Sequence, residues 1–141
     1  MIKKLQAKAM PLLVAAVLIG GVVIMFTGGK SKGFVVDVKV PNLSAVALEG
    51  EQLFNSTCAR CHGNNAAGTD KGPPFVYTIY NPGHHGDIAF VLAAKNGVRA
   101  HHWRYGNMPA LGTPEADVLK IVRYVRELQR ANGIVTKPHN M

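Results

Sequence analysis

Two cysteines separated by two residues, with a histidine directly after the second, constrain this chain more than any other feature. They are Cys58 and Cys61 in the run C-A-R-C-H, which ends at His62, and the chain has no other cysteine. A thioredoxin-like redox pair would need a surrounding βαβ pattern, which this sequence lacks. A structural zinc site would need a second ligand pair at finger-like spacing. A disulfide across so short a gap would be strained and exchangeable.

The spacing C-x-x-C-H is instead typical of covalent attachment of a c-type haem. A zinc site remains an alternative, because four of the five further histidines fall in two pairs, His84-His85 and His101-His102. A small domain often needs a bound cofactor to complete its core, and a covalent haem would meet that need.

An uncharged stretch near the N-terminus, residues 10–26, predicts a helix that spans a membrane. At 1.5 Å per residue it would reach roughly 26 Å, close to the lower limit for a span. Three lysines precede it and two follow closely, which favours a cytoplasmic N-terminus. A cleaved signal peptide is the alternative. We therefore expect a cytoplasmic segment at 1–9, a transmembrane anchor at 10–27, and everything after it in the periplasm of a bacterium.

Residues 28–46 should connect this anchor to a domain at 47–141. Within the connecting segment, the run FVVDVKVP alternates apolar and other residues from Phe34 to Val40, which predicts a short strand. Such a strand would lie against the surface of its own domain or pair with a partner subunit.

Three patterns in the domain predict helices, with a loop rich in glycine and proline at 63–86. The first helix runs through 45–56 with Ser44 as N-cap, and the second from Asp87 to Asn96-Gly97. The third begins with Thr113 as N-cap and Pro114 at the first helical position, and stops at Asn132-Gly133. The domain is therefore expected to be all-α.

The first and third helices are expected to cross. Gly50 costs its helix about 1 kcal/mol against alanine, and close approach of the last helix would justify it. Phe54 and Tyr124 are natural aromatic contacts at the crossing. The apolar face of the last helix is predicted to comprise Val118, Leu119, Ile121, Val122, Val125 and Leu128.

Taken together, GEQLF before CARCH, then GPPF, a helix ending in NGV, NMPAL and Tyr124 resemble class I c-type cytochromes. The resemblance covers roughly residues 47–132. It implies three to four helices around one covalently bound haem c, here preceded by the N-terminal transmembrane helix. Cys58 and Cys61 would form the thioethers, and His62 would be the proximal iron ligand.

The resemblance also implies that Pro73 accepts a hydrogen bond from the other nitrogen of His62, unless the register is shifted by one to Pro74. Met108 matches the distal ligand. Apart from Met141, the last residue, it is the only methionine of the haem domain, and it lies in a loop before Pro109, where a side chain can point inward. His101 or His102 as the distal ligand is the rival assignment.

The two histidine pairs flank the predicted helix at 87–96. Ten helical residues would separate its ends by roughly 15 Å, so the four histidines are not expected to surround one extra metal ion such as copper. They are interpreted as polar residues at the haem edge. Arg99, Trp103 and Arg104 are candidates to donate hydrogen bonds to the haem propionates, with ordinary surface or packing roles as the alternative.

The net charge of +8 belongs mostly to residues 1–47, which carry six lysines and one aspartate. No basic stripe with interleaved aromatic residues is present, so nucleic-acid binding is not expected. An iron with His and Met ligands has no open position, which favours electron transfer over catalysis. We expect a one-electron carrier, not an enzyme, between complexes such as a quinol–cytochrome c reductase and a terminal oxidase. A fixed subunit of an oxidase or dehydrogenase, and a haem or metal sensor, are the alternatives.

Overall fold

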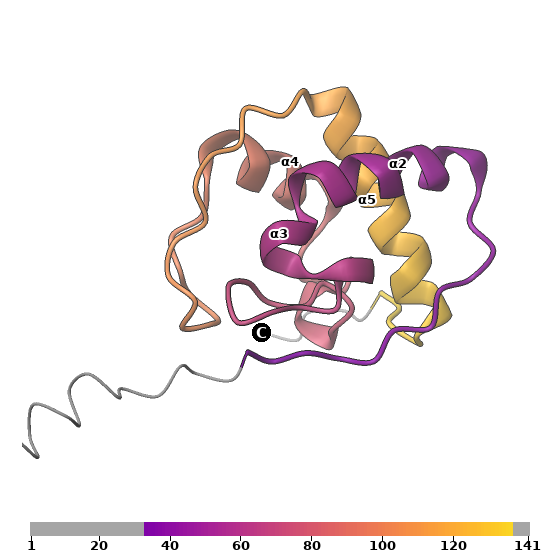
Figure 1. The fold of residues 1–141 in the computed structure, drawn as a ribbon, viewed down its shortest axis with the longest axis horizontal. Coiled ribbons are helices and arrows are strands. Elements are labelled where there is room, and N and C mark those ends of the chain that lie inside the picture. The colour runs from indigo at the N-terminus through magenta and orange to yellow at the C-terminus, as the bar shows by residue number, and fades with distance from the viewer. Residues whose placement is uncertain (1–32, 137–141) are drawn as a thin grey trace, which may run out of the picture. The chain divides into compact units, whose positions relative to one another are not determined.

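The computed structural model describes residues 33–136, and the predicted anchor at 10–27 lies outside them. In the described range the secondary structure is helical and contains no strand, which confirms the all-α prediction for the domain. No helix in that range is both long and apolar enough to cross a membrane. The elements are α2 (Ala45–Thr57), α3 (Ala59–His62), α4 (Asp87–Asn96), α5 (Glu115–Ala131) and the short 3-10 turns η1 (Asn64–Ala66) and η2 (Thr78–Tyr80) (Figure 1).

The crossing of α2 over α5 organises the domain (Figure 1). Gly50 is buried at this crossing, and a Cβ atom there would overlap the carbonyl oxygen of Lys120. The rings of Phe54 and Tyr124 pack beside it with their centroids 5.5 Å apart, and both side chains are fully buried. The predicted close approach and its aromatic contact are both confirmed.

The N-terminus of α2 is capped as predicted and is also tied to α5. Ser44 Oγ accepts a hydrogen bond from the Ala47 N–H at 3.3 Å and donates one to Glu127 Oε1 at 2.7 Å. The Ser44 N–H donates to the other carboxylate oxygen of Glu127 at 2.9 Å. One serine therefore caps the start of α2 and joins the two long helices.

The predicted start of α5 is wrong by one residue. Pro114, with ψ of 141°, is the N-cap, and the helix begins at Glu115 rather than at Pro114. The fixed φ of proline suits both positions, so only ψ distinguishes them. Leu119 is also misplaced, since its side chain is 48% exposed. The other five residues of the predicted apolar face are buried: Val118, Ile121, Val122, Val125 and Leu128.

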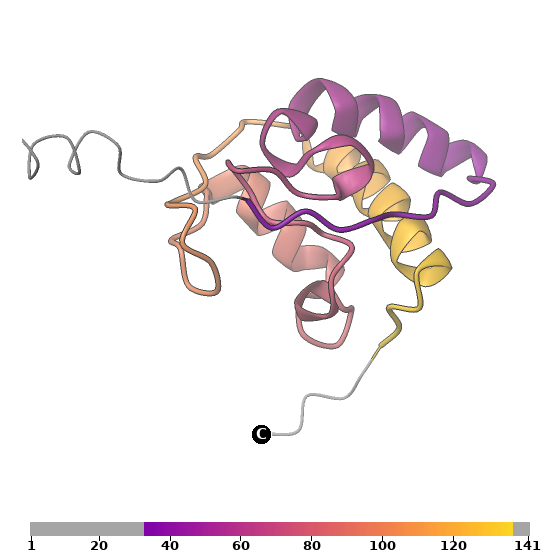
Figure 2. The same cartoon turned by 60° about the horizontal axis from the view of Figure 1, so that its bottom comes forward.

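The segment 34–40 is extended but forms no strand, which corrects the prediction. Its hydrogen bonds go to a loop and to a side chain rather than to a neighbouring strand. Val36 N–H donates to Ala67 O at 2.9 Å, and Lys39 exchanges hydrogen bonds with the Asn132 side chain at 2.9 and 2.8 Å. Val36 and Val38 pack against the core. The segment thus lies along its own domain (Figure 2).

Candidate functional site

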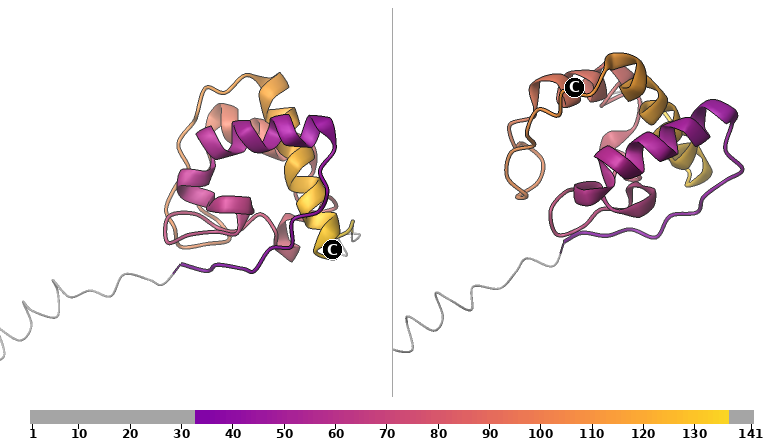
Figure 3. Two further views of the ribbon diagram at one scale, coloured as in Figure 1. Left: turned by 45° about the vertical axis from the view of Figure 1, so that its right-hand side comes forward. Right: turned by 45° about the horizontal axis from the view of Figure 1, so that its top comes forward.

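A cavity of about 430 Å³ lies between two walls that are far apart in the sequence. Cys58, His62 and Pro73 line it from the side of α3, and Trp103 and Met108 from the loop between α4 and α5. This loop, orange in Figure 3, runs from the end of α4 back to the start of α5. Most of the remaining lining side chains are apolar or aromatic, so the cavity suits a large flat apolar group.

His62 is held in a single orientation on the first wall. Its ring Nδ1 lies 2.9 Å from Pro73 O, its side chain is 7% exposed, and the Phe75 ring stacks on it with centroids 4.0 Å apart. Because a carbonyl only accepts, Nδ1 carries the proton and Nε2 has the lone pair. Burial lowers the pKa of His62, although the hydrogen bond to Pro73 opposes the shift. The residue is thus a neutral imidazole, the form that binds a metal.

The two cysteines stand on one turn, since Cys61 N–H donates to Cys58 O at 3.1 Å. Cys58 lines the cavity, whereas Cys61 is half-buried beside it. Burial, and then the charge of Cys61, raises the pKa of the Cys58 thiol to about 11. A redox-active C-x-x-C pair needs a lowered thiol pKa. The raised pKa of Cys58 is therefore unlike that of a redox-active dithiol.

Met108 is fixed through its backbone on the second wall. Its N–H and C=O exchange hydrogen bonds with Val98 C=O and N–H, both at 2.9 Å. Gly97, with φ of +75°, permits this approach, because a Cβ there would lie 2.6 Å from Met108 O. The half-buried Met108 side chain lines the cavity.

The three candidate propionate donors are placed differently. Trp103 lines the cavity, and its Nε1 is buried without a hydrogen-bond partner of suitable geometry in the described range. The indole N–H is nevertheless near enough to the Tyr80 hydroxyl to oppose the rise that burial causes in the pKa of that phenol. Arg99 and Arg104 are exposed and do not line the cavity. A buried donor at the cavity wall is well placed to donate to an acceptor on a bound group. Together with the apolar walls and the lone pair of His62, this indole donor makes the residues of the cavity suitable for holding a haem.

The expectation that the two histidine pairs lie apart is wrong. His84 Nε2 lies 3.4 Å from His102 Nε2, and the ring centroids of His85 and His101 are 6.1 Å apart. The length of α4 does not determine the distance between the two histidine pairs, because residues 97–102 can reach about 20 Å when extended. They return along α4 to its beginning.

Burial is the main cause that lowers the pKa of two of these histidines, His85 and His102. At His85 the hydrogen bond to Ile79 O opposes the shift, and the charges of His84, His101 and Arg126 add to it. At His102 the charges of the other three histidines add to it.

A buried arginine on α5, which the sequence did not reveal, anchors the segment that carries His85. Arg126 Nε donates to Asp87 Oδ1 at 2.8 Å, and its Nη1 to Tyr80 O at 2.8 Å. Its Nη2 donates to His85 O. From the sequence, Arg126 is a favourable charge near a helix C-terminus, and nothing in the local pattern indicates these long-range partners.

Residues 47–129 match the family described as Cytochrome c. The chain belongs to the cytochrome c family. It is also 35% identical over 96 residues to the Cbb3-type cytochrome c oxidase subunit CcoP of Rubrivivax gelatinosus. That match covers 64% of this chain and 27% of the relative, so the chain spans about a quarter of the relative's length. No solved structure matches.

These matches confirm the resemblance to class I c-type cytochromes. Membership of this family implies a covalently bound haem c and a role in electron transfer. The particular roles of Cys58, Cys61, His62 and Met108 remain predictions, now with a cavity that Cys58, His62 and Met108 share and that Cys61 adjoins.

Proposed function

We propose that this cytochrome c is a membrane-anchored, monohaem, one-electron carrier whose haem domain faces the bacterial periplasm. It would exchange electrons with respiratory or photosynthetic complexes, such as a quinol–cytochrome c reductase and a terminal oxidase. The supporting observation is that His62 and Met108 line one cavity from two separately anchored walls.

Four side chains would hold the haem, two through covalent bonds and two as ligands of the iron. Cys58 and Cys61 would form the thioethers, while His62 and Met108 would bind the iron. The haem supplies a reversible one-electron couple. Pro73 fixes the ring of His62 and increases its basicity as a ligand. A methionine ligand together with a histidine ligand would raise the reduction potential relative to two histidine ligands.

Two features support a carrier rather than an enzyme. An iron bound by both side chains would have no open position for a substrate. The acidic residues of the chain are few and scattered, with no carboxylate dyad in the sequence. Anchoring is supported by the uncharged stretch at 10–27 and by the lysines that precede it.

The similarity to a CcoP subunit favours one second candidate, a cytochrome held permanently in an oxidase complex. Extraction of the native membrane with mild detergent distinguishes the two. A free carrier elutes alone, whereas a subunit co-elutes with oxidase activity and with further haem.

The ligand assignment is tested by absorption spectroscopy of the ferric holoprotein. A weak far-red band reports a bond between sulfur and iron, so it should be present in the native protein and lost in Met108→Ala. The matched control is Leu111→Ala, which removes an apolar side chain lining the same cavity from the same loop but no sulfur. If the band survives in Met108→Ala, Met108 is not the ligand. Binding of carbon monoxide by the reduced native protein would contradict a saturated iron.

A further inference from the structure

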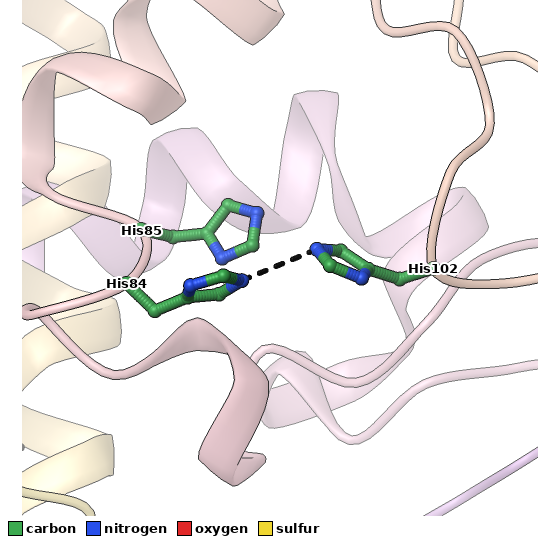
Figure 4. Close-up of side chains that lie close together, drawn as sticks. All are labelled: His84, His85 and His102. Atoms are coloured by element: carbon green, nitrogen blue, oxygen red, sulfur yellow. Dashed lines mark hydrogen bonds between the residues drawn. The ribbon is translucent and has the colours of Figure 1, made fainter. Parts of the chain in front are cut away.

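Three histidines gather at one place beside the haem cavity without any role in the proposed haem ligation. His84 and His85 come from the turn before α4, and His102 comes from the loop after it (Figure 4). One ring nitrogen from each lies within 4.8 Å of the other two. His85 and His102 also line the haem cavity, whereas His84 does not.

We propose that His84, His85 and His102 form a binding site for a divalent transition metal ion of the zinc type, separate from the haem iron. Zinc bonds to imidazole nitrogen are about 2.0–2.1 Å long and tetrahedral, so two ligand nitrogens should stand about 3.3 Å apart. His84 Nε2 and His102 Nε2 are 3.4 Å apart. The two rings therefore already span one edge of a zinc tetrahedron.

His85 is oriented for the same role by its backbone surroundings. Its Nδ1 donates to Ile79 O at 2.8 Å, which leaves the lone pair on Nε2. Metal-binding histidines commonly donate their other nitrogen to a carbonyl in this way. Arg126 holds the His85 carbonyl from α5, and the His85 N–H donates to Asn81 O at 2.9 Å. The first half of the site is thus built before a metal arrives.

The fourth histidine nearby is a natural contrast. His101 is exposed, its Nδ1 donates to Arg99 O at 2.8 Å, and it is not part of the group of three. His84 and His102 are exposed and His85 is half-buried, so a fourth position would face water. Three histidines with one open position are a known zinc arrangement.

The geometry favours zinc over copper. Imidazole binds both ions, and Cu²⁺ generally binds more tightly. Cu²⁺ prefers a tetragonal arrangement, however, in which neighbouring nitrogens would be about 2.9 Å apart at similar bond lengths. The positive charge of Arg126, which contacts the His85 carbonyl, is offset by its ion pair with Asp87 at 2.8 Å.

A metal bound here would join two segments that are eighteen residues apart in the sequence. One is the turn that Arg126 ties to α5, and the other is the loop that continues to Met108. Because the metal would bind only when both segments are in place, its binding should stabilise the folded domain.

The test uses the full-length holoprotein in detergent, purified without a histidine tag and treated with a chelator. Equilibrium dialysis against Zn²⁺, with metal measured by mass spectrometry, should give about one zinc per chain. Affinity should fall about ten-fold or more in His84→Ala, His85→Ala and His102→Ala. His101→Ala should bind as the native protein does. Zn²⁺ should also raise the thermal unfolding midpoint of the native protein but not of His84→Ala.

Haem absorption spectra of all variants show whether each one is folded. His84→Ala decides the matter, because His84 does not line the haem cavity. The proposal is overturned if the native protein takes up no zinc, in which case the histidines form only a hydrogen-bonded cluster. It is equally overturned if His101→Ala weakens binding as much as His84→Ala, or if no single substitution does.

Discussion

The two walls of the haem cavity are built in opposite ways. On the wall of α3, His62 is almost completely buried, hydrogen-bonded to Pro73 and stacked on Phe75. On the other wall, Met108 is held by its backbone to Val98, while most residues from 99 to 107 are exposed. The first wall is fixed by side-chain packing in the core, and the second mainly by the β-bridge at the base of a loop and by the contacts of Trp103 and Tyr105 with Phe34.

This difference indicates where each wall can be altered without loss of the fold. Regions with few buried apolar contacts open at a lower free-energy cost than the core does. We therefore expect the methionine side to exchange its ligand or change its environment more readily than the histidine side.

The largest expected effect is on the buried wall. Phe75→Ala removes a ring that packs on His62, Tyr80 and Phe90, and such truncations cost about 3–5 kcal/mol. Denaturant unfolding of the holoprotein measures the cost. Leu111→Ala, on the half-buried wall, should cost less than half as much. Equal costs would show that the two walls are equally well packed.

The next effect is on the bridge that carries Met108. Gly97→Ala should cost about 2–4 kcal/mol, because alanine is strained at φ of +75° and its Cβ would press on Met108 O. The far-red band should weaken with it. Gly106→Ala is the matched control, with φ of +86° and open space around its Cβ. It should cost about 1–2 kcal/mol and leave the band unchanged. A band lost equally in both variants would show that the bridge does not position the methionine.

The same contrast explains what the sequence could predict. The helices, the Ser44 cap and the Gly50 crossing follow from local patterns, and the structure has all of them. The C-x-x-C-H motif is local in the sequence, so it predicts the wall of the cavity on the side of α3 without knowledge of the tertiary fold.

The other wall depends on how a loop returns, and no local pattern specifies that. The histidine pairs were expected to lie apart because only the length of α4 was considered, yet the loop after it folds back to His84. The segment 34–40 has the alternation of a strand, but without an extended neighbour it forms no ladder. Arg126 reaches partners far along the chain, which its helical position does not reveal.

A smaller effect is expected where Glu127 of α5 binds Ser44 at the start of α2. Burial raises the pKa of Glu127, but hydrogen bonds from Ser44 and Arg123 outweigh it and lower the pKa below 4.5. The carboxylate thus stabilises the fold above its unfolded pKa, and this contribution is lost as the pH falls through the folded pKa. Glu127→Gln should cost about 1–2 kcal/mol at pH 7.

Denaturant unfolding at a series of pH values checks this expectation. The difference between native protein and Glu127→Gln should shrink as the pH falls toward about 3. Glu115→Gln, in the exposed first turn of α5, is the control and should cost only about 0.5 kcal/mol. A difference that stays constant with pH would mean that the charge of Glu127 does not contribute.

The smallest effect on stability, and the most specific on function, is expected for Trp103→Phe. The indole N–H has no hydrogen-bond partner in the described part of the chain, and phenylalanine keeps the stacking on Phe34, so unfolding should change by less than about 1 kcal/mol. If that N–H donates to a haem propionate, its loss raises the pKa of the propionate. The pH dependence of the reduction potential should then shift to higher pH. Arg104→Gln, on the exposed surface, should shift neither quantity, and a shift in Arg104→Gln without one in Trp103→Phe would place the arginine, not the tryptophan, at the propionate.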